Sequence, residues 1–364
     1  MDDSSLIRRL VTSALEADPE LQVAGTACNG LEALTKVKEL NPDVVTLDIE
    51  MPELDGLGAL QRIRVDNPRL PIIMFSTLTE RGARQTLEAL ALGASDYVTK
   101  PSNTGSVGES IERVRQEVVP RIKALAGARR IVGLGVAHSE PRTRPLTASA
   151  SGAVTASAPA TTLPRPAPRT TNAAPELLVI GCSTGGPDAL TRVLSELPGN
   201  LPVPVLAVQH MPPVFTTMFA QRLDNASPLS VREAADGDVA AAGQVLLAPG
   251  DYHMRLVPSA NGVKVRLDQG PQLNFCRPAV DALFVSAAEV YGDKVLGLVL
   301  TGMGHDGLVG CQELEKAGSF SVVQDEATSV VWGMPGAVAT AGLAHEVLPL
   351  ENIGSYVTQA LTSR

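Results

Sequence analysis

The fold of this chain is decided by residues 177–188, which read LLVIGCSTGGPD. The apolar run 177–180 predicts a buried parallel strand, which gives way to a turn holding Ser183 and two glycines. Pro187 follows, and proline is favoured in the first turn of a helix. A strand, a glycine-rich turn and a helix in this order predict a functional site, because free N–H groups and the helix dipole favour negative charge there. Ser183 is either a helix cap or a nucleophile, and this stretch leaves both open.

Length and composition indicate a globular protein of two domains. The chain has 364 residues, more than one typical core holds, and 44% of them are hydrophobic. The net charge of −9, without a basic cluster, argues against a nucleic-acid partner. The four cysteines form no CxxC pair, which favours reduced thiols over a disulfide framework or a zinc site. No signal peptide is visible, and no apolar run reaches the roughly 18 residues of a membrane span, so we expect a cytoplasmic protein without membrane insertion.

Residues 1–126 alternate short apolar runs with helical patterns, which predicts a doubly wound parallel sheet. The expected strands are 21–27, 43–48, 71–76 and 95–99, and the expected helices are 31–40, 57–65, 82–92 and 107–126. In this architecture, functional residues gather at the carboxyl ends of the strands.

Polar residues occupy those strand ends. Asp48 and Ser76 end their strands, and Lys100 follows the last one. Asp2 and Asp3 lead into the first helix. Each aspartate alone is more often a turn or cap residue, but three carboxylates with a lysine and a hydroxyl predict a site for a divalent cation and a phosphoryl group.

This pattern closely resembles the receiver domain of response regulators, which has a flavodoxin-like fold. The resemblance implies that Asp48 accepts the phosphoryl group, and that Asp2, Asp3 and Asp48 hold Mg²⁺. The other implied roles are sensing of the phosphoryl group by Ser76 and Lys100 and a switch aromatic at Tyr97. The resemblance rests on residues 2–4 (DDS), 46–56 (TLDIEMPELDG), Ser76 and 98–101 (VTKP).

The receiver pattern departs from the family at its start. Receivers usually carry an apolar strand before the acidic pair, in the middle of the sheet, whereas Asp2 here follows Met1 directly. That first strand is therefore apparently missing. A parallel sheet without a central strand leaves backbone groups unpaired. We hypothesise that the natural start lies several residues upstream.

Residues 127–175 predict a flexible linker. The composition changes from about residue 127, and residues 138–175 are rich in Ala, Ser, Thr and Pro with almost no large apolar residue, so they cannot offset the entropy of ordering. We expect them to tether the receiver to a second α/β domain at 176–364.

The second domain again alternates strand and helix patterns, which predicts a doubly wound, mostly parallel sheet with an antiparallel hairpin over 253–267. The expected strands are 177–180, 203–209, 244–248, 253–257, 263–267, 295–300, 320–323 and 346–350. The expected helices are 188–197, 214–223, 278–290, 308–317, 335–341 and 352–361.

Three strand ends of this domain carry groups that suit acyl transfer. Ser183 follows the first strand, His210 follows the second, and the turn 301–307 with Asp306 follows the strand at 295–300. A histidine takes the proton of a serine, and a carboxylate holds the histidine. Glycine-rich turns supply N–H donors to an oxyanion.

Alternative interpretations remain for each of these residues taken singly. Ser183 fits a cap or phosphate cradle, His210 a structural strand-end residue, and Asp306 a helix cap. Residues 181–185 match the G-x-S-x-G elbow, but α/β-hydrolases place the acid before the histidine. Nucleotide binding is weaker, since no G-x-G-x-x-G and no P-loop lysine is present.

The second domain also resembles the chemotaxis protein-glutamate methylesterases, the CheB family. The resemblance implies that Ser183 is the nucleophile, His210 its base, and Asp306 the orienting acid. The backbone N–H of Met303 is implied as an oxyanion donor, and Thr184, beside the nucleophile, is a further candidate. The motifs are 180–186 (IGCSTGG), 209–213 (QHMPP), 248–251 (APGD), 277–281 (RPAVD), 300–304 (LTGMG) with Asp306 and Gly307, and 332–335 (WGMP).

The family implies hydrolysis of glutamate methyl esters on methyl-accepting chemoreceptors, with release of methanol, and deamidation of receptor glutamines. The ester reaction needs no cofactor. Unphosphorylated, the receiver is implied to cover the catalytic crevice until a chemotaxis histidine kinase phosphorylates Asp48. Two alternatives stay open, a binding adaptor without turnover and a hydrolase serving a chemosensory system other than motility.

Overall fold

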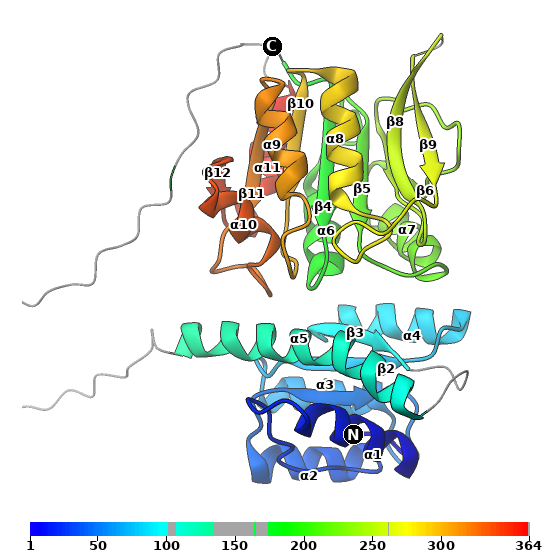
Figure 1. Ribbon diagram of the computed structural model, residues 1–364, viewed down its shortest axis with the longest axis vertical. Helices are drawn as coiled ribbons and strands as arrows, with labels where there is room; N and C mark the ends of the chain where they lie inside the picture. Colours follow the sequence, from blue (N-terminus) through cyan, green and yellow to red (C-terminus); the bar gives the residue numbers. More distant parts are fainter. Residues whose placement is uncertain (101–106, 134–163, 165–173, 261, 363–364) are drawn as a thin grey trace, which may run out of the picture.

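The computed structural model describes residues 1–100, 107–133, 164, 174–260 and 262–362 (Figure 1). The predicted linker over 127–175 lies largely outside the described residues. Where it is described, at 127–133, the backbone continues helix α5 beyond the expected end at residue 126.

The receiver contains a three-stranded parallel sheet in the order β1-β2-β3 with helices around it, as the sequence pattern predicts. Its helices are α1 (Ser5–Glu16), α2 (Gly30–Leu40), α3 (Gly56–Asp66), α4 (Glu80–Ala91) and α5 (Val107–Gly133). Its strands are β1 (Val45–Asp48), β2 (Ile72–Ser76) and β3 (Asp96–Thr99).

The strand expected at 21–27 does not form, since the described residues give it only a short backbone contact. Met1 exchanges backbone hydrogen bonds of 2.9 Å with Thr46 and Asp48 in β1, and Asp2 N donates to Ala27 O at 3.2 Å. Among the residues that the structure describes, Met1 and Asp2 make the backbone contacts between β1 and segment 21–27. Without a longer partner alongside, the segment has no ladder to join. A cavity of about 50 Å³, lined in part by Val23, lies in this region.

The second domain is built on a seven-stranded parallel sheet in the order β12-β11-β10-β4-β5-β7-β6, with a separate antiparallel pair β8-β9. Its strands are β4 (Leu177–Cys182), β5 (Val205–Gln209), β6 (Ser230–Glu233), β7 (Gln244–Leu247), β8 (His253–Ser259), β9 (Gly262–Asp268), β10 (Val295–Val299), β11 (Phe320–Gln324) and β12 (Ala344–Leu348). The hairpin expected over 253–267 is confirmed, whereas β6 was not expected.

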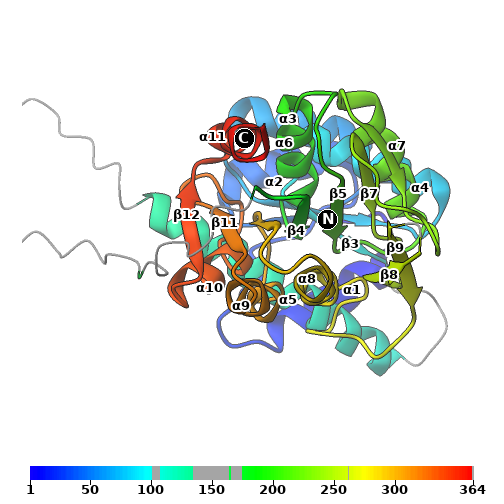
Figure 2. The ribbon, with the colours of Figure 1, turned by 90° about the horizontal axis from the view of Figure 1, so that it is seen from above.

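Helices cover both faces of this sheet (Figure 2). One layer holds α6 (Gly186–Glu196), α7 (Phe215–Ala226) and α11 (Leu350–Thr362). The other holds α8 (Val280–Tyr291), α9 (Leu308–Lys316) and α10 (Met334–Thr340). Two buried clusters, one on each face, pack these layers on the sheet. Strand order reverses at β4, since β5 lies on one side of it and β10 on the other, and such a switch point is where α/β sheets bind ligands.

The two domains share two apolar clusters, one of which holds Val331 of the second domain with Phe75 and Val98 of the receiver. Leu87 and Leu90 of α4 belong to the same buried cluster as Phe215 and Phe219 of α7. Figure 1 shows α4, β3 and α5 on the side of the receiver that faces the second domain. Among the described residues, no helix is long and apolar enough to cross a membrane.

Candidate active site

Ser183 lies in the turn between β4 and α6, at the switch point of the sheet. Its backbone is pinned on both sides, because Ser183 N donates to Thr301 O at 3.0 Å and Gln209 Nε2 donates to Ser183 O at 3.0 Å. Helix α6 has Gly185 at its N-cap, with φ of 75°, and no side chain caps it. The capping alternative for Ser183 is therefore wrong. In the described part of the chain, nothing forms a hydrogen bond with its hydroxyl.

Two glycines around this turn are closely packed. A Cβ on Gly185 would lie 2.6 Å from Val330 Cβ, and the residue has a left-handed backbone. A Cβ on Gly302 would lie 2.3 Å from Met334 Sδ and 3.0 Å from Ser183 Cβ. The turn after β10 therefore packs directly on the serine.

Met303 follows Gly302 in that turn. Its backbone N–H donates to no backbone group within the described ranges, whereas Gly302 N donates to Val331 O at 3.0 Å. Met303 thus carries a free donor one residue from the contact with Ser183, which fits the oxyanion donor expected there.

His210 and Asp306 form a close pair. His210 follows β5, Asp306 lies just before α9, and 2.8 Å separates His210 Nε2 from Asp306 Oδ2. The other ring nitrogen, Nδ1, lies 3.5 Å from Cys276 Sγ. Burial opposes the charged form of His210, but Cys276 and Asp306 outweigh it and raise the pKa of the imidazole to about 10.

Asp306 is fixed by the N-terminus of α8. It is 2% exposed and accepts hydrogen bonds from Val280 N at 2.7 Å and Asp281 N at 3.0 Å. Burial alone would raise its pKa, but His210 and these N–H groups lower it to about 2. The carboxylate therefore stays ionised beside the imidazole.

Asp281 caps the N-terminus of α9, as Asp306 caps that of α8. It lies in the first turn of α8 and accepts from Gly307 N at 2.9 Å and Gly310 N at 2.7 Å, at the start of α9. Asn274 Nδ2 bridges the two carboxylates, at 2.8 Å from Asp281 Oδ2 and 2.9 Å from Asp306 Oδ1. Asp306, just before α9, thus caps the start of α8, and Asp281, in α8, caps the start of α9.

Sequence reasoning missed three of these residues, namely Asn274, Cys276 and Asp281. Asp281 closes the RPAVD motif that carries part of the resemblance, and its place early in a helix was a visible capping signal. The other two lie in an irregular segment, where no periodicity reveals what a side chain contacts.

Thr184 contacts the receiver instead of the triad. It is 5% exposed, and its hydroxyl donates to Asp96 Oδ2 at 2.7 Å. Tyr97, the expected switch aromatic, stacks on Phe215 of α7 with ring centroids 5.0 Å apart and planes 6° from parallel. Arg222 of α7 donates to Leu87 O in α4. The receiver therefore lies directly on the residue that follows the candidate nucleophile.

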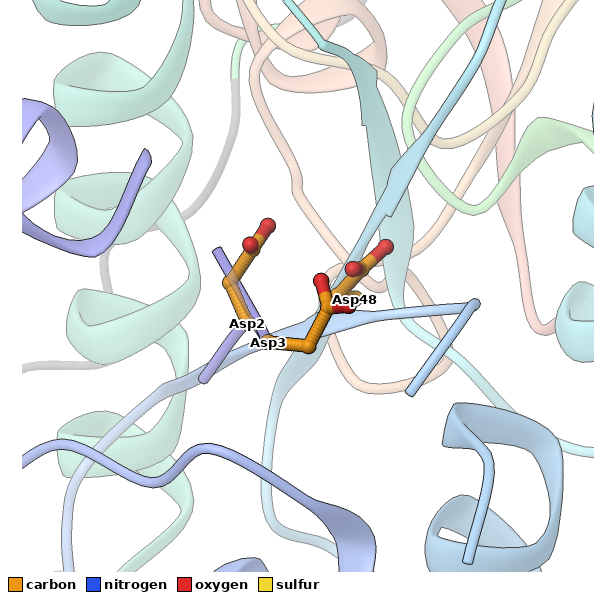
Figure 3. Close-up of side chains that lie close together, drawn as sticks. All are labelled: Asp2, Asp3 and Asp48. Carbon is orange, nitrogen blue, oxygen red and sulfur yellow. The ribbon is translucent and has the colours of Figure 1, made fainter. Parts of the chain in front are cut away.

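The predicted phosphorylation site is also assembled. Carboxylate oxygens of Asp2, Asp3 and Asp48 lie within 4.8 Å of one another beside the end of β1 (Figure 3). Lys100 Nζ lies 2.6 Å from Asp48 Oδ2 and 3.1 Å from Asp2 Oδ2. Burial raises the pKa of Asp48 to about 6, against the opposing effect of Lys100. Ser76, at the end of β2, accepts from Thr86 Oγ1 at 2.7 Å.

This donor set fits a hard divalent cation. Three carboxylates offer the oxygen ligands that Mg²⁺ prefers. Asp2 Oδ2 is buried, and its positively charged neighbour is Lys100 Nζ at 3.1 Å. The carboxylates of this cluster therefore lie where positive charge, from the lysine or from a bound cation, compensates for their burial.

Comparison with known proteins matches both halves of the chain. The family model described as CheB methylesterase covers residues 178–357, and that of the response regulator receiver domain covers residues 1–112. The protein-glutamate methylesterase/protein-glutamine glutaminase of a Nocardioides species is 52% identical over 99% of this chain and 94% of its own length. The Trichodesmium erythraeum protein of the same name is 44% identical over 99% of this chain and 97% of its own.

A solved structure supports the fold of the second domain. The catalytic domain of the Thermotoga maritima CheB methylesterase is 42% identical, with a TM-score of 0.50, and covers 51% of this chain and 98% of that one. The alignment over nearly the full length of named relatives, together with the two family models, leads to one conclusion: the chain belongs to the CheB family of protein-glutamate methylesterases that carry an N-terminal receiver domain.

Proposed function

We propose that this protein hydrolyses glutamate methyl esters on chemoreceptors, deamidates specific receptor glutamines to glutamate, and is activated when Asp48 is phosphorylated. The observation that carries the catalytic proposal is the His210–Asp306 pair at the same switch point as Ser183, whose side chain does not cap helix α6. The named relatives of the family supply the substrate class.

The chemistry follows from three side chains. Asp306 holds Nε2 of His210, so Nδ1 is the nitrogen left to take the proton of Ser183. The serine oxygen attacks the ester or amide carbonyl, and the N–H of Met303 donates to the oxyanion. His210 then gives the proton to the leaving methanol or ammonia, and water repeats the sequence to release the glutamate.

The present arrangement suits a resting enzyme. Nδ1 faces Cys276 and no hydrogen bond joins the described Ser183 hydroxyl to His210, while the raised pKa keeps the imidazole protonated. Thr184 is tied to Asp96 of the receiver. These contacts support Thr184 as a contact for the resting receiver, with any role in the reaction secondary.

In the receiver, we assign Asp48 as phosphoacceptor, with Asp2 and Asp3 as its partners for Mg²⁺. The bound cation would shield phosphoryl oxygens. Lys100 contacts Asp48 already and Ser76 lies at the neighbouring strand end, so both are placed to sense a phosphoryl group. A chemotaxis histidine kinase is the donor that this family implies, and Tyr97 on Phe215 is the aromatic that links the site to the catalytic domain.

We assign the domains as 1–126, 127–175 and 176–364, with the middle segment as a tether whose first residues, 127–133, continue helix α5. We place the protein in the cytoplasm, which the four free cysteines support. Nucleic acid is not an expected partner, because the net charge is −9. We propose no direct insertion into a membrane.

The test is methanol release from methylated receptor membranes, with and without a small phosphodonor. Ser183→Ala should abolish release and labelling by a serine-reactive probe. Asp48→Asn should retain basal release that the phosphodonor does not stimulate. An Asp48→Asn protein that responds normally refutes the switch, and a Ser183→Ala protein with wild-type turnover refutes the nucleophile. A wild-type protein that shows neither probe labelling of Ser183 nor methanol release would favour the adaptor alternative.

A further inference from the structure

A two-residue turn before α8 touches both members of the catalytic pair. Leu273 and Cys276 exchange backbone hydrogen bonds of 3.1 and 2.8 Å, and between them Asn274 and Phe275 have φ of 51° and 63°. Two successive positive φ values are the pattern of a type I′ turn, in which Asn-Gly is the favoured pair. Phenylalanine occupies the position that glycine suits best.

Both neighbours of Phe275 are fixed to the triad. The Asn274 amide donates to Asp306 Oδ1 at 2.9 Å, and Cys276 Sγ lies 3.5 Å from His210 Nδ1. The position of Phe275 relative to the reacting groups is therefore set by these two contacts, one on each side.

The phenyl ring itself packs on nothing. Phe275 is 95% exposed, the highest value among the described large apolar side chains, and it belongs to none of the buried clusters. An exposed apolar residue alone is ordinary. A bulky residue held in left-handed backbone is costly, and such strain gathers at functional sites.

The ring is exposed while the receiver lies on Thr184. The receiver therefore leaves it accessible in the resting arrangement. A side chain that contacts the substrate at the edge of the site has to be exposed in this way.

We propose that Phe275 determines substrate specificity by packing on apolar side chains of the receptor helix that carries the methylated glutamate. This rests on the proposed function. The reacting side chain has to reach Ser183 and His210, so its helix passes the rim of the site. Residues three and four positions away lie on the same face of a helix, about one 5.4 Å turn off. Phe275 directly precedes Cys276, which contacts His210, so we expect its ring to contact that neighbouring turn of the receptor helix.

Phe275→Gly is the most informative variant, because glycine readily adopts the positive φ of this turn and the folded structure should therefore be retained. For methylated receptor membranes, we expect KM to rise about tenfold with kcat unchanged, as fits the loss of one partly buried aromatic contact. The rate at which a fluorophosphonate labels Ser183 should not change. Phe275→Leu should restore KM to within about threefold, and Phe275→Ser should not. The control is Val65→Ala in the receiver, which removes another exposed apolar side chain and should behave as wild type.

An unchanged KM in Phe275→Gly overturns the proposal. Equal loss of fluorophosphonate labelling also overturns it, because the turn would then act on the triad and not on the substrate. Failure of the proposed function looks different, since the wild-type protein would then release no methanol from receptor membranes.

Discussion

Replacing Asp96 with alanine should raise the activity of the unphosphorylated enzyme. Asp96 Oδ2 accepts from Thr184 Oγ1 at 2.7 Å and from Arg121 Nε at 3.2 Å, and the carboxylate is 7% exposed. It is the residue through which the receiver reaches the position next to Ser183. Removing it takes the acceptor from the Thr184 hydroxyl only while the domains are docked, whereas Arg121, in the same receiver, loses its acceptor in both states.

The size of the effect follows from the charge of the acceptor. A hydrogen bond to a charged group contributes about 1.5–3 kcal/mol. Each 1.4 kcal/mol is a factor of ten, so the docked-to-open ratio should fall about 10- to 150-fold. Basal activity rises in proportion until the open state dominates. Asp96→Asn keeps a neutral acceptor and should give a smaller rise, because neutral hydrogen bonds contribute about 0.5–1.5 kcal/mol.

The assay is methanol release from methylated receptor membranes without phosphodonor, followed by the same assay with it. Stimulated rates should match wild type for both variants, and the phosphodonor should still label Asp48, which shows that the receiver is folded. Wild-type basal activity in Asp96→Ala would refute the reasoning, and so would a rise in Asp96→Asn larger than in Asp96→Ala.

Two further predictions concern the histidine and its support. His210 must be neutral to accept a proton, so activity falls as pH drops through the pKa of its imidazole. Because Cys276 raises that pKa, Cys276→Ala should move the acid limb of the kcat/KM profile to lower pH. The control is Cys28→Ala, at an exposed cysteine, which should leave the limb in place. An unmoved limb contradicts this. Asn274→Gly keeps a turn-compatible backbone but removes the amide from Asp306, so kcat should fall about tenfold at constant KM, in keeping with about 1.5–3 kcal/mol for a hydrogen bond to a charged group. Wild-type kcat in this variant would show that the bridge is dispensable.

The raised pKa of His210 also links its charge to stability. Its value is raised from 6.5 to about 10, so its contribution is fully present below pH 6.5 and is lost as pH rises through about 10. Thermal unfolding of wild type should therefore show a loss in this alkaline range that His210→Gln lacks. Identical pH dependence in the two proteins would contradict the assignment.

Regular elements were predictable from the sequence because buried parallel strands are apolar runs with turn residues at both ends. Segment 21–27 has the apolar pattern of a strand, but the described residues give it no strand to pair with. Whether a pairing strand is present cannot be judged from the pattern of the segment alone. Strand β6, with the sequence SVRE, is short and polar because it forms the edge of the sheet. The linker prediction falls mostly on residues that are not described.

Some residues of the candidate site were predictable from the sequence and others were not. Ser183, His210 and Asp306 follow strands, and parallel topology alone brings strand ends to one edge, so their order along the chain was enough. The bridge through Asn274 and the contact between Asp96 and Thr184 join segments far apart in sequence. Contacts of this kind depend on how irregular segments and whole domains pack, which spacing does not encode.

The reciprocal capping of α8 and α9 has a consequence for how this enzyme can move and evolve. Asp306 anchors the first N–H groups of one helix while Asp281 anchors the other, so the acid is a structural joint as much as a catalytic group. Any rearrangement between resting and working states then falls to the imidazole and the serine turn, with the acid stationary. Substitution at Asp306 should lower melting temperature and turnover together, which leaves few routes by which a family member could discard catalysis and keep the fold.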